Sequence, residues 1–158
     1  MNKTRLIPAS PILQRGSVQA TVVALDGGSV ADIFTITGGP VAVLALIGEV
    51  TEAVSAHACN AKLVADPTTG IDTDMCTVLD IQSLAIGDFL YIDGTIGNAL
   101  AKAVPGTALP LGIGMDIPLI LPVGTVDLNL ANSNPTSGIA TFTMLYQPLV
   151  NGARVQGS

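Results

Sequence analysis

Short segments rich in Val, Ile, Leu and Thr alternate along this chain with turns made of glycine, proline and aspartate. The clearest is Ile139–Gln147, in which residues 139, 141, 143 and 145 share one face and residues 140, 142, 144 and 146 share the other. An alternation of period two, bounded by turn residues, is typical of β-strands. The polar loop Asn132–Gly138 precedes this segment, and Pro148 limits it because proline cannot donate to a ladder.

Nine further segments have the same texture. They are Val18–Leu25, Asp32–Thr37, Val41–Val50, Val54–Ala65, Cys76–Ile81, Phe89–Ile92, Asn98–Val104, Met115–Leu121 and Thr125–Leu130. Val54–Ala65 contains helix-friendly alanines, but no capping signal or 3.6-residue period supports a helix there, so a strand is favoured. About ten short strands at this spacing predict an all-β, single-domain β-sandwich or closed barrel.

Val41–Val50 is apolar on both faces, unlike the alternating segments. It follows Asp32–Thr37 through the turn Gly38-Gly39-Pro40, and we expect the two segments to form a hairpin. A strand that is apolar on both sides is normally covered on both sides. The sequence therefore predicts that Val41–Val50 is buried within a sandwich or against a neighbouring subunit.

Composition points to an assembly component. Of the 158 residues only 11% are charged, whereas an ordinary soluble domain has about 25%. The longest apolar run, Pro40–Ile47, is far shorter than the roughly 18–20 residues that span a bilayer, so we expect no membrane partner. A chain this apolar is expected to bury part of its surface against other subunits.

Charge divides the chain into a basic arm and an acidic body. Residues 1–15 carry Lys3, Arg5 and Arg15 and no acid, hence +3, whereas residues 16–158 carry −9. Such a body would be repelled by duplex DNA, so we expect no nucleic-acid partner. Pro8 and Pro11 favour an extended course for the arm.

The arm could be a solvated terminus, a contact for nucleic acid, or a segment docked on an acidic neighbouring subunit. We favour docking. The candidate interface residues are the basic and apolar side chains of the arm: Arg5, Leu6, Ile7, Ile12, Leu13 and Arg15.

The cysteines and the acids offer little chemistry. Met1–Arg15 lacks the apolar core of a secretory signal, so Cys59 and Cys76 are expected to be buried thiols, although a disulfide between them is an alternative. The acids at positions 66, 72 and 74 surround a glycine turn and could bind calcium, but no EF-hand glycine and glutamate follow. A solvated acidic turn is the preferred interpretation, and no cofactor or metal is expected.

Ser55, His57 and Cys59 alternate, so on a strand they would project from one face. A Cys–His pair can act as nucleophile and base, but no orienting partner or oxyanion loop is recognisable. One histidine and two cysteines, with no Cys-x-x-Cys pair, also make a zinc site improbable. Five aromatic residues are too few for a sugar cleft, and no glycine-rich phosphate loop has the required spacing. We expect no enzymatic activity.

Several segments resemble small virion proteins of tailed bacteriophages. The segments are Asp32–Val41, Leu44–Val50, Asn60–Gly70, Gly124–Leu128, Ser137-Gly138, Tyr146–Leu149 and Gly152–Val155. The resemblance implies a capsid decoration (cement) protein: a homotrimer on the outer capsid surface at local threefold positions, made in the host cytoplasm and bound to the major capsid protein. It brings no catalytic residues.

Two other functions stay open. The first is a tail or head-fibre component that binds a host surface, although exposed aromatic residues and a fibrous repeat are lacking. The second is a small β-barrel enzyme or ligand-binding module that uses His57, Cys59, Asp72 and Asp74.

Overall fold

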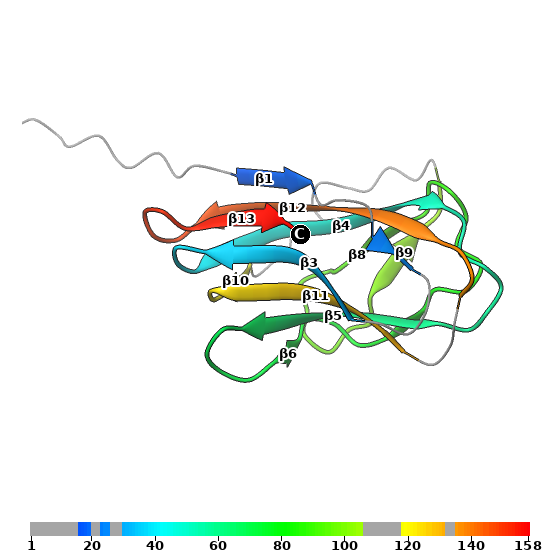
Figure 1. Ribbon diagram of the computed structural model, residues 1–158, viewed down its shortest axis with the longest axis horizontal. Coiled ribbons are helices and arrows are strands. Elements are labelled where there is room, and N and C mark those ends of the chain that lie inside the picture. The colour runs from blue at the N-terminus through cyan, green and yellow to red at the C-terminus, as the bar shows by residue number, and fades with distance from the viewer. Residues whose placement is uncertain (1–15, 20–22, 26–29, 106–117, 132–134) are drawn as a thin grey trace, which may run out of the picture.

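The protein is an all-β sandwich. The computed structural model describes residues 16–19, 23–25, 30–105, 118–131 and 135–158. Within these ranges the chain forms thirteen strands in two antiparallel sheets that pack face to face (Figure 1). The described ranges include no helix that is long and apolar enough to cross a membrane. The prediction of an all-β fold is confirmed, and of the two architectures it allowed, the fold is the sandwich.

Sheet A has seven strands in the order β1-β12-β4-β8-β9, with β10 also paired to β4 and β2 to β12. The strands are β1 (Gly16–Gln19), β2 (Val23–Ala24), β4 (Val41–Glu52), β8 (Phe89–Tyr91), β9 (Ala101–Ala103), β10 (Leu119–Leu121) and β12 (Ile139–Pro148). The long strands β4 and β12 form its centre, and the short strands lie around them.

Sheet B has six strands in the order β13-β3-β11-β5-β6, with β7 also paired to β5. The strands are β3 (Val30–Thr37), β5 (Asn60–Pro67), β6 (Thr73–Asp74), β7 (Leu79–Asp80), β11 (Gly124–Ala131) and β13 (Arg154–Gly157). In Figure 1 this sheet lies in front of sheet A.

The core fills the space between the sheets. On β12 the predicted alternation holds, since Ala140, Phe142, Met144 and Tyr146 are all buried. Together with Phe34 from sheet B, these side chains belong to one apolar cluster that extends from Val23 to Val155. β4 is largely covered on both faces, as its sequence predicted.

The predicted hairpin between Asp32–Thr37 and Val41–Val50 is wrong. β3 pairs with β11 and β13 in sheet B, whereas β4 pairs with β12, β8 and β10 in sheet A. The turn between them is therefore a corner at which the chain changes sheets. Gly38 has a φ of +75°, and a Cβ there would collide with the carbonyl oxygen of Gly152 in the corner between β12 and β13. The backbone N–H of Leu149 donates to the oxygen of Pro40 at 3.1 Å and ties the two corners together.

Two predicted strands are shorter than expected because loops satisfy their backbone. Within Val54–Ala65 the strand starts only at Asn60, and the N–H of Val54 donates instead to the oxygen of Leu84 at 3.0 Å. Within Cys76–Ile81 only residues 79–80 are a strand, and the N–H of Thr77 donates to the oxygen of Asn98 at 2.7 Å. The first segment crosses from sheet A to sheet B. The second connects two strands of sheet B through a bridge to residue 99, so neither segment follows a ladder.

Some expectations for short strands fall partly outside the described residues. Of Val18–Leu25, the structure places residues 18–19 in β1 and 23–24 in β2. Of Met115–Leu121, it describes residues 118–121, of which the last three form β10. β13 closes the order of sheet B beside β3, and the sequence did not predict it.

Candidate interaction surface

The predicted interface residues Arg5, Leu6, Ile7, Ile12, Leu13 and Arg15 all lie outside the described residues. The structure does describe the strand that follows them, β1. Its first residue, Gly16, pairs with Tyr146 of β12. The arm therefore joins the body at one edge of sheet A.

The two lateral seams of the sandwich differ. At one seam the edge strands β1 and β13 lie side by side, so sheet A meets sheet B (Figure 1). At the other seam sheet A ends in β9 and β10 and sheet B ends in β6 and β7, and no described strand pairs with the outer side of any of them. Here Thr77 bonds to Asn98 and Leu100, which closes part of the seam. The part beside β10 stays open.

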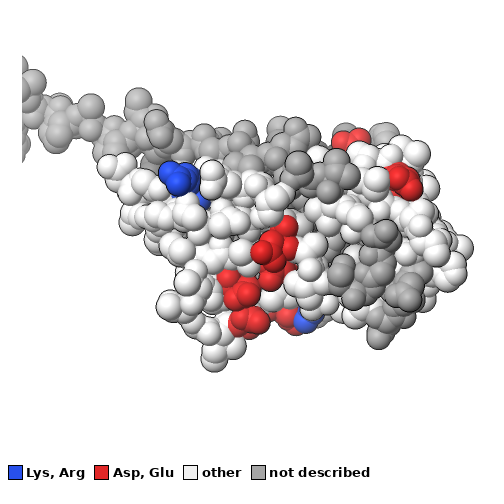
Figure 2. All heavy atoms as spheres, in the orientation of Figure 1, with Lys and Arg blue, Asp and Glu red and all other residues white. Residues whose placement is uncertain are grey.

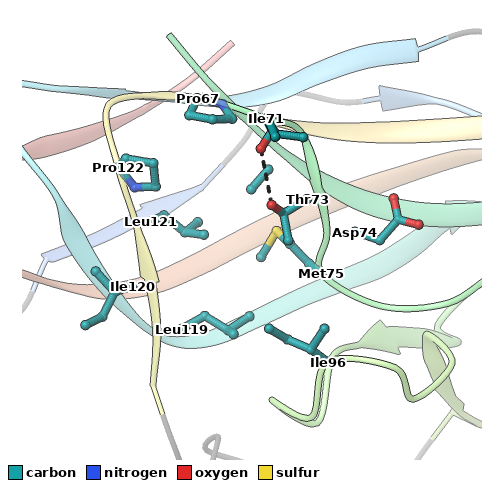
Figure 3. A pocket seen from close by; sticks show the side chains of 11 residues that line it. Pro67, Ile71, Thr73, Asp74, Met75, Ile96, Leu119, Ile120, Leu121 and Pro122 are labelled. Carbon is teal, nitrogen blue, oxygen red and sulfur yellow. Dashed lines mark hydrogen bonds between the residues drawn. The ribbon is translucent and has the colours of Figure 1, made fainter. Parts of the chain in front are cut away.

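A groove of about 200 Å³ occupies this open part, and we call it the seam groove (Figure 3). Its lining comes from β5, the connection into β6, the loop before β9, and β10. The buried side chains of Met75 and Leu121 form its floor. Three isoleucines at its rim are exposed: Ile71 by 86%, Ile96 by 60% and Ile120 by 66%.

The seam groove is thus an apolar surface in contact with water. Scattered single apolar side chains are normal on a protein surface, but a group of large ones around one hollow marks an interaction site. Asp74 is the charged residue in its lining. The Lys62 ammonium lies 2.7 Å from the Asp74 carboxylate and neutralises it.

Acidic side chains gather on the outer face of sheet B, next to the groove. In Figure 2 they lie over β3, β11 and β5. The ladders bring them together, because Asp127 of β11 pairs with Asp32 of β3, and Thr125 pairs with Asp66 of β5. Asp72, from the connection into β6, lies close enough to Asp66 for its charge to act on that carboxyl. We call Asp32, Asp66, Asp72 and Asp127 the acidic cluster.

Repulsion from neighbouring carboxylates dominates at the exposed Asp66. The nearby charge of Asp72 is the largest cause that raises the pKa of Asp66, and Asp32 adds to it. At Asp127 burial raises the pKa most, and Asp32, Asp66 and Asp72 raise it further, while a hydrogen bond from Thr125 opposes them. Asp127 is only 7% exposed, and among the described residues its Oδ1 has no hydrogen-bond partner.

The three candidate calcium ligands, Asp66, Asp72 and Asp74, do not lie together. Asp66 and Asp72 are adjacent, but Asp74 faces Lys62 instead of joining them. No group of three potential metal ligands converges in the described part of the chain. The acidic turn is a carboxylate-rich surface, and its neighbours at the groove are Pro67, Ile71 and Thr73.

The prediction that Ser55, His57 and Cys59 share one strand face is wrong. These residues lie before β5, outside any ladder, and their side chains diverge: His57 is exposed and Cys59 is fully buried. The Oγ of Ser55 is 3.3 Å from Nδ1 of His57 and accepts a bond from the N–H of Thr136. Burial, followed by the charge of Asp80, raises the pKa of the Cys59 thiol, so the thiolate that a nucleophile needs is disfavoured.

Both cysteines are free and buried, as the sequence predicted. Burial also raises the pKa of Cys76, whose Sγ accepts a bond from the N–H of Leu63 at 3.3 Å. Sequence reasoning missed the seam groove, because its isoleucines come from separate segments that only the sheet order brings together. The exposed position of Ile71 inside the acidic turn 66–74 is the one signal that could have pointed to it.

In comparisons with known proteins, the chain matches no family model, no curated protein and no solved structure. The fold and the surface therefore carry the functional argument.

Proposed function

We propose that this protein is a capsid decoration subunit of a tailed bacteriophage. In this role it assembles with copies of itself, as a trimer, on the outer surface of the head and joins neighbouring major capsid proteins. It is a structural protein without enzymatic activity or cofactor, and it binds neither nucleic acid nor membrane. The resemblance of residues 30–155 to small virion proteins motivates the proposal.

The seam groove is the observation that supports this proposal best. Ile71, Ile96 and Ile120 stand exposed around one hollow on a chain in which 11% of residues are charged. Covering apolar surface contributes about 25 cal/mol per Å², before the cost of association is subtracted. A subunit that contacts several neighbours gains from multivalency, so modest single contacts suffice to hold a shell.

The decisive experiment locates the protein on particles. Purified full-length protein is added to expanded heads that lack it, and the particles are examined by sedimentation and cryo-electron microscopy. We expect saturable binding and density at local threefold positions. In immunogold labelling of whole virions, label confined to the tail would instead identify a tail or head-fibre component. A protein that stays monomeric at micromolar concentration in light scattering would contradict a trimeric subunit.

The histidine provides a test against the enzymatic alternative. His57 is exposed and its contact to Ser55 is long, so His57→Ala should leave folding and particle binding unchanged. Circular dichroism and the same sedimentation assay measure both. A folded His57→Ala variant that loses function would support the enzymatic alternative, with the Ser55–His57 pair as its site.

A further inference from the structure

The seam groove and the N-terminal arm are complementary in chemistry. The groove offers exposed isoleucines at positions 71, 96 and 120, and the acidic cluster adjoins it. Residues 1–15 combine two apolar pairs, Leu6-Ile7 and Ile12-Leu13, with three cations and no acid. An apolar, basic, proline-containing segment matches an apolar groove with an acidic margin.

The acidic margin lies where the cations would be needed. Asp66 precedes Pro67 of the groove, and Asp72 lies between the groove residues Ile71 and Thr73. The charges that shift the pKa of Asp66 are the negative ones of Asp72 and Asp32. A guanidinium placed here would relieve the repulsion between these carboxylates.

The direction of β1, and not its distance from the groove, argues against the arm of the same chain. Gly16, Tyr146, Val43 and Leu119 lie in one row across sheet A, so three strand spacings of about 4.8 Å separate the arm's origin from β10. β1 is antiparallel to β12, so its N-terminal end at Gly16 is directed toward Pro148 and the end of the sheet. The corners 38–40 and 149–152 stand at that same end, between β1 and the groove.

A neighbouring copy is within reach. Fifteen residues in an extended course span at most about 50 Å, and a compact body of this size has a radius of gyration of roughly 15 Å. The contact would be heterologous, with the arm of one copy in the groove of the next. Such contacts close into a ring where the rotation allows it.

We propose that the seam groove binds the N-terminal arm of a second copy of this chain. The apolar pairs Leu6-Ile7 and Ile12-Leu13 cover Ile71, Ile96 and Ile120, and an arginine of the arm faces Asp66 and Asp72. The inference concerns self-assembly of the free protein, so it can fail while the proposed role on capsids stands, and it can hold if that role is wrong.

Cysteine cross-linking in the full-length protein, without capsids, tests the proposal. One preparation carries Ile12→Cys and a first affinity tag, and a second carries Ile120→Cys and a different tag. The native Cys59 and Cys76 are buried and stay in place. The matched control replaces Ile120→Cys by Val30→Cys, because Val30 is 60% exposed but lies at the opposite end of sheet B from Gly124 and the groove.

We expect a disulfide between differently tagged chains that forms at least tenfold faster with Ile120→Cys than with Val30→Cys. Equal rates would overturn the proposal. A chain carrying both Ile12→Cys and Ile120→Cys distinguishes the other occupant: a bond within one chain whose rate does not change on dilution means that the arm fills its own groove, and the proposal is wrong.

A charge-introducing variant provides a second readout. Ile120→Asp changes a side chain that is 66% exposed, so folding should be preserved. We expect it to shift the oligomer to monomer in light scattering at micromolar concentration, whereas Val30→Asp should not. An Ile120→Asp protein that assembles like the unchanged chain would overturn the proposal.

Discussion

The two lateral seams of the sandwich differ in how the edges of the two sheets meet. At the first, β1 and β13 meet, and at the adjoining end of the sandwich the corners 38–40 and 149–152 carry the chain directly from one sheet to the other. At the second, the edge strands β10 and β6 have three and two residues and leave the seam groove between them. Backbone packing closes the first seam, and exposed isoleucines line the second.

The difference shows where this molecule tolerates change. At the corner beside the closed seam, backbone approaches backbone, since a Cβ at Gly38 would meet the carbonyl of Gly152. The rim of the open seam contributes little to the folded monomer, because its large side chains contact water. Substitutions at the first should therefore affect stability, and those at the second should affect assembly.

The largest effect should come from Gly38→Ala. Gly38 has a left-handed φ of +75°, and a Cβ there meets the carbonyl of Gly152, which is backbone and cannot rotate away. We expect the free energy of unfolding to fall by about 2–4 kcal/mol in urea denaturation.

Gly152→Ala is the matched control for the corner. Its φ is +89°, but a Cβ there would have nothing within 4 Å. The cost should be the conformational one alone, about 1 kcal/mol. Equal costs for the two variants would mean that the contact between the corners adds nothing to the closed seam.

The next largest effect on stability should come from the floor of the seam groove, and the rim should contribute much less. Leu121 is buried and Ile120 beside it is exposed. Leu121→Ala should lower the free energy of unfolding by about 2 kcal/mol, at the low end for a buried leucine because the groove is open to water. Ile120→Ala should change it by less than about 0.5 kcal/mol. Thermal and urea unfolding check both, and a large loss for Ile120→Ala would show that the rim supports the fold itself.

The sequence predicts the strands better than their partners. Period-two alternation located β3 and β12 nearly residue by residue, and a run that is apolar on both faces located β4, because each of these strands buries a continuous face. It did not show that β3 and β4 belong to different sheets, since Gly38-Gly39-Pro40 is compatible with a hairpin and with a corner. It also extended strands into 54–59 and 76–78, where hydrogen bonds to distant loops replace the ladder.

The candidate surface was predictable only in part. The uneven charge along the chain predicted a basic segment and an acidic body without any structure. The acidic cluster depends on register: Asp32 and Asp127 are far apart in sequence and become neighbours only because β3 pairs with β11. Nothing local in the sequence contains that information.

A smaller effect on stability should come from Asp127, on the acidic face that adjoins the open seam. Burial and its neighbours raise the pKa of Asp127 above the ordinary value of 3.8. A carboxyl whose folded pKa is raised contributes stability below its unfolded pKa, and this contribution is lost as the pH rises through the folded pKa. At pH 7 Asp127 therefore destabilises the body, and Asp127→Asn should add up to about 1 kcal/mol.

Urea unfolding at pH 7 and near pH 3.5 tests this sign. The advantage of Asp127→Asn should be present at pH 7 and should shrink at the lower pH, where the raised pKa leaves more of the Asp127 carboxyl protonated. Thr35→Ala on the same face of sheet B, which removes no charge, serves as the control. An advantage that is independent of pH would contradict a raised pKa.

The smallest effect on stability should come from removal of the arm. Residues 2–15 precede β1, so their deletion leaves every described strand intact, and the free energy of unfolding should change by less than about 0.5 kcal/mol.

Removal of the arm should nevertheless weaken assembly. Exposed ion pairs from Arg5 or Arg15 contribute only about 0–1 kcal/mol each, so most of the affinity should come from Leu6, Ile7, Ile12 and Leu13. Replacing these four residues with serine in the full-length chain should therefore weaken self-association and attachment to particles nearly as much as the deletion. Replacing both arginines with glutamine should weaken them less. Light scattering and particle sedimentation measure the two losses, and a truncated protein that assembles and attaches as tightly as the full chain would show that the open seam does not depend on the arm.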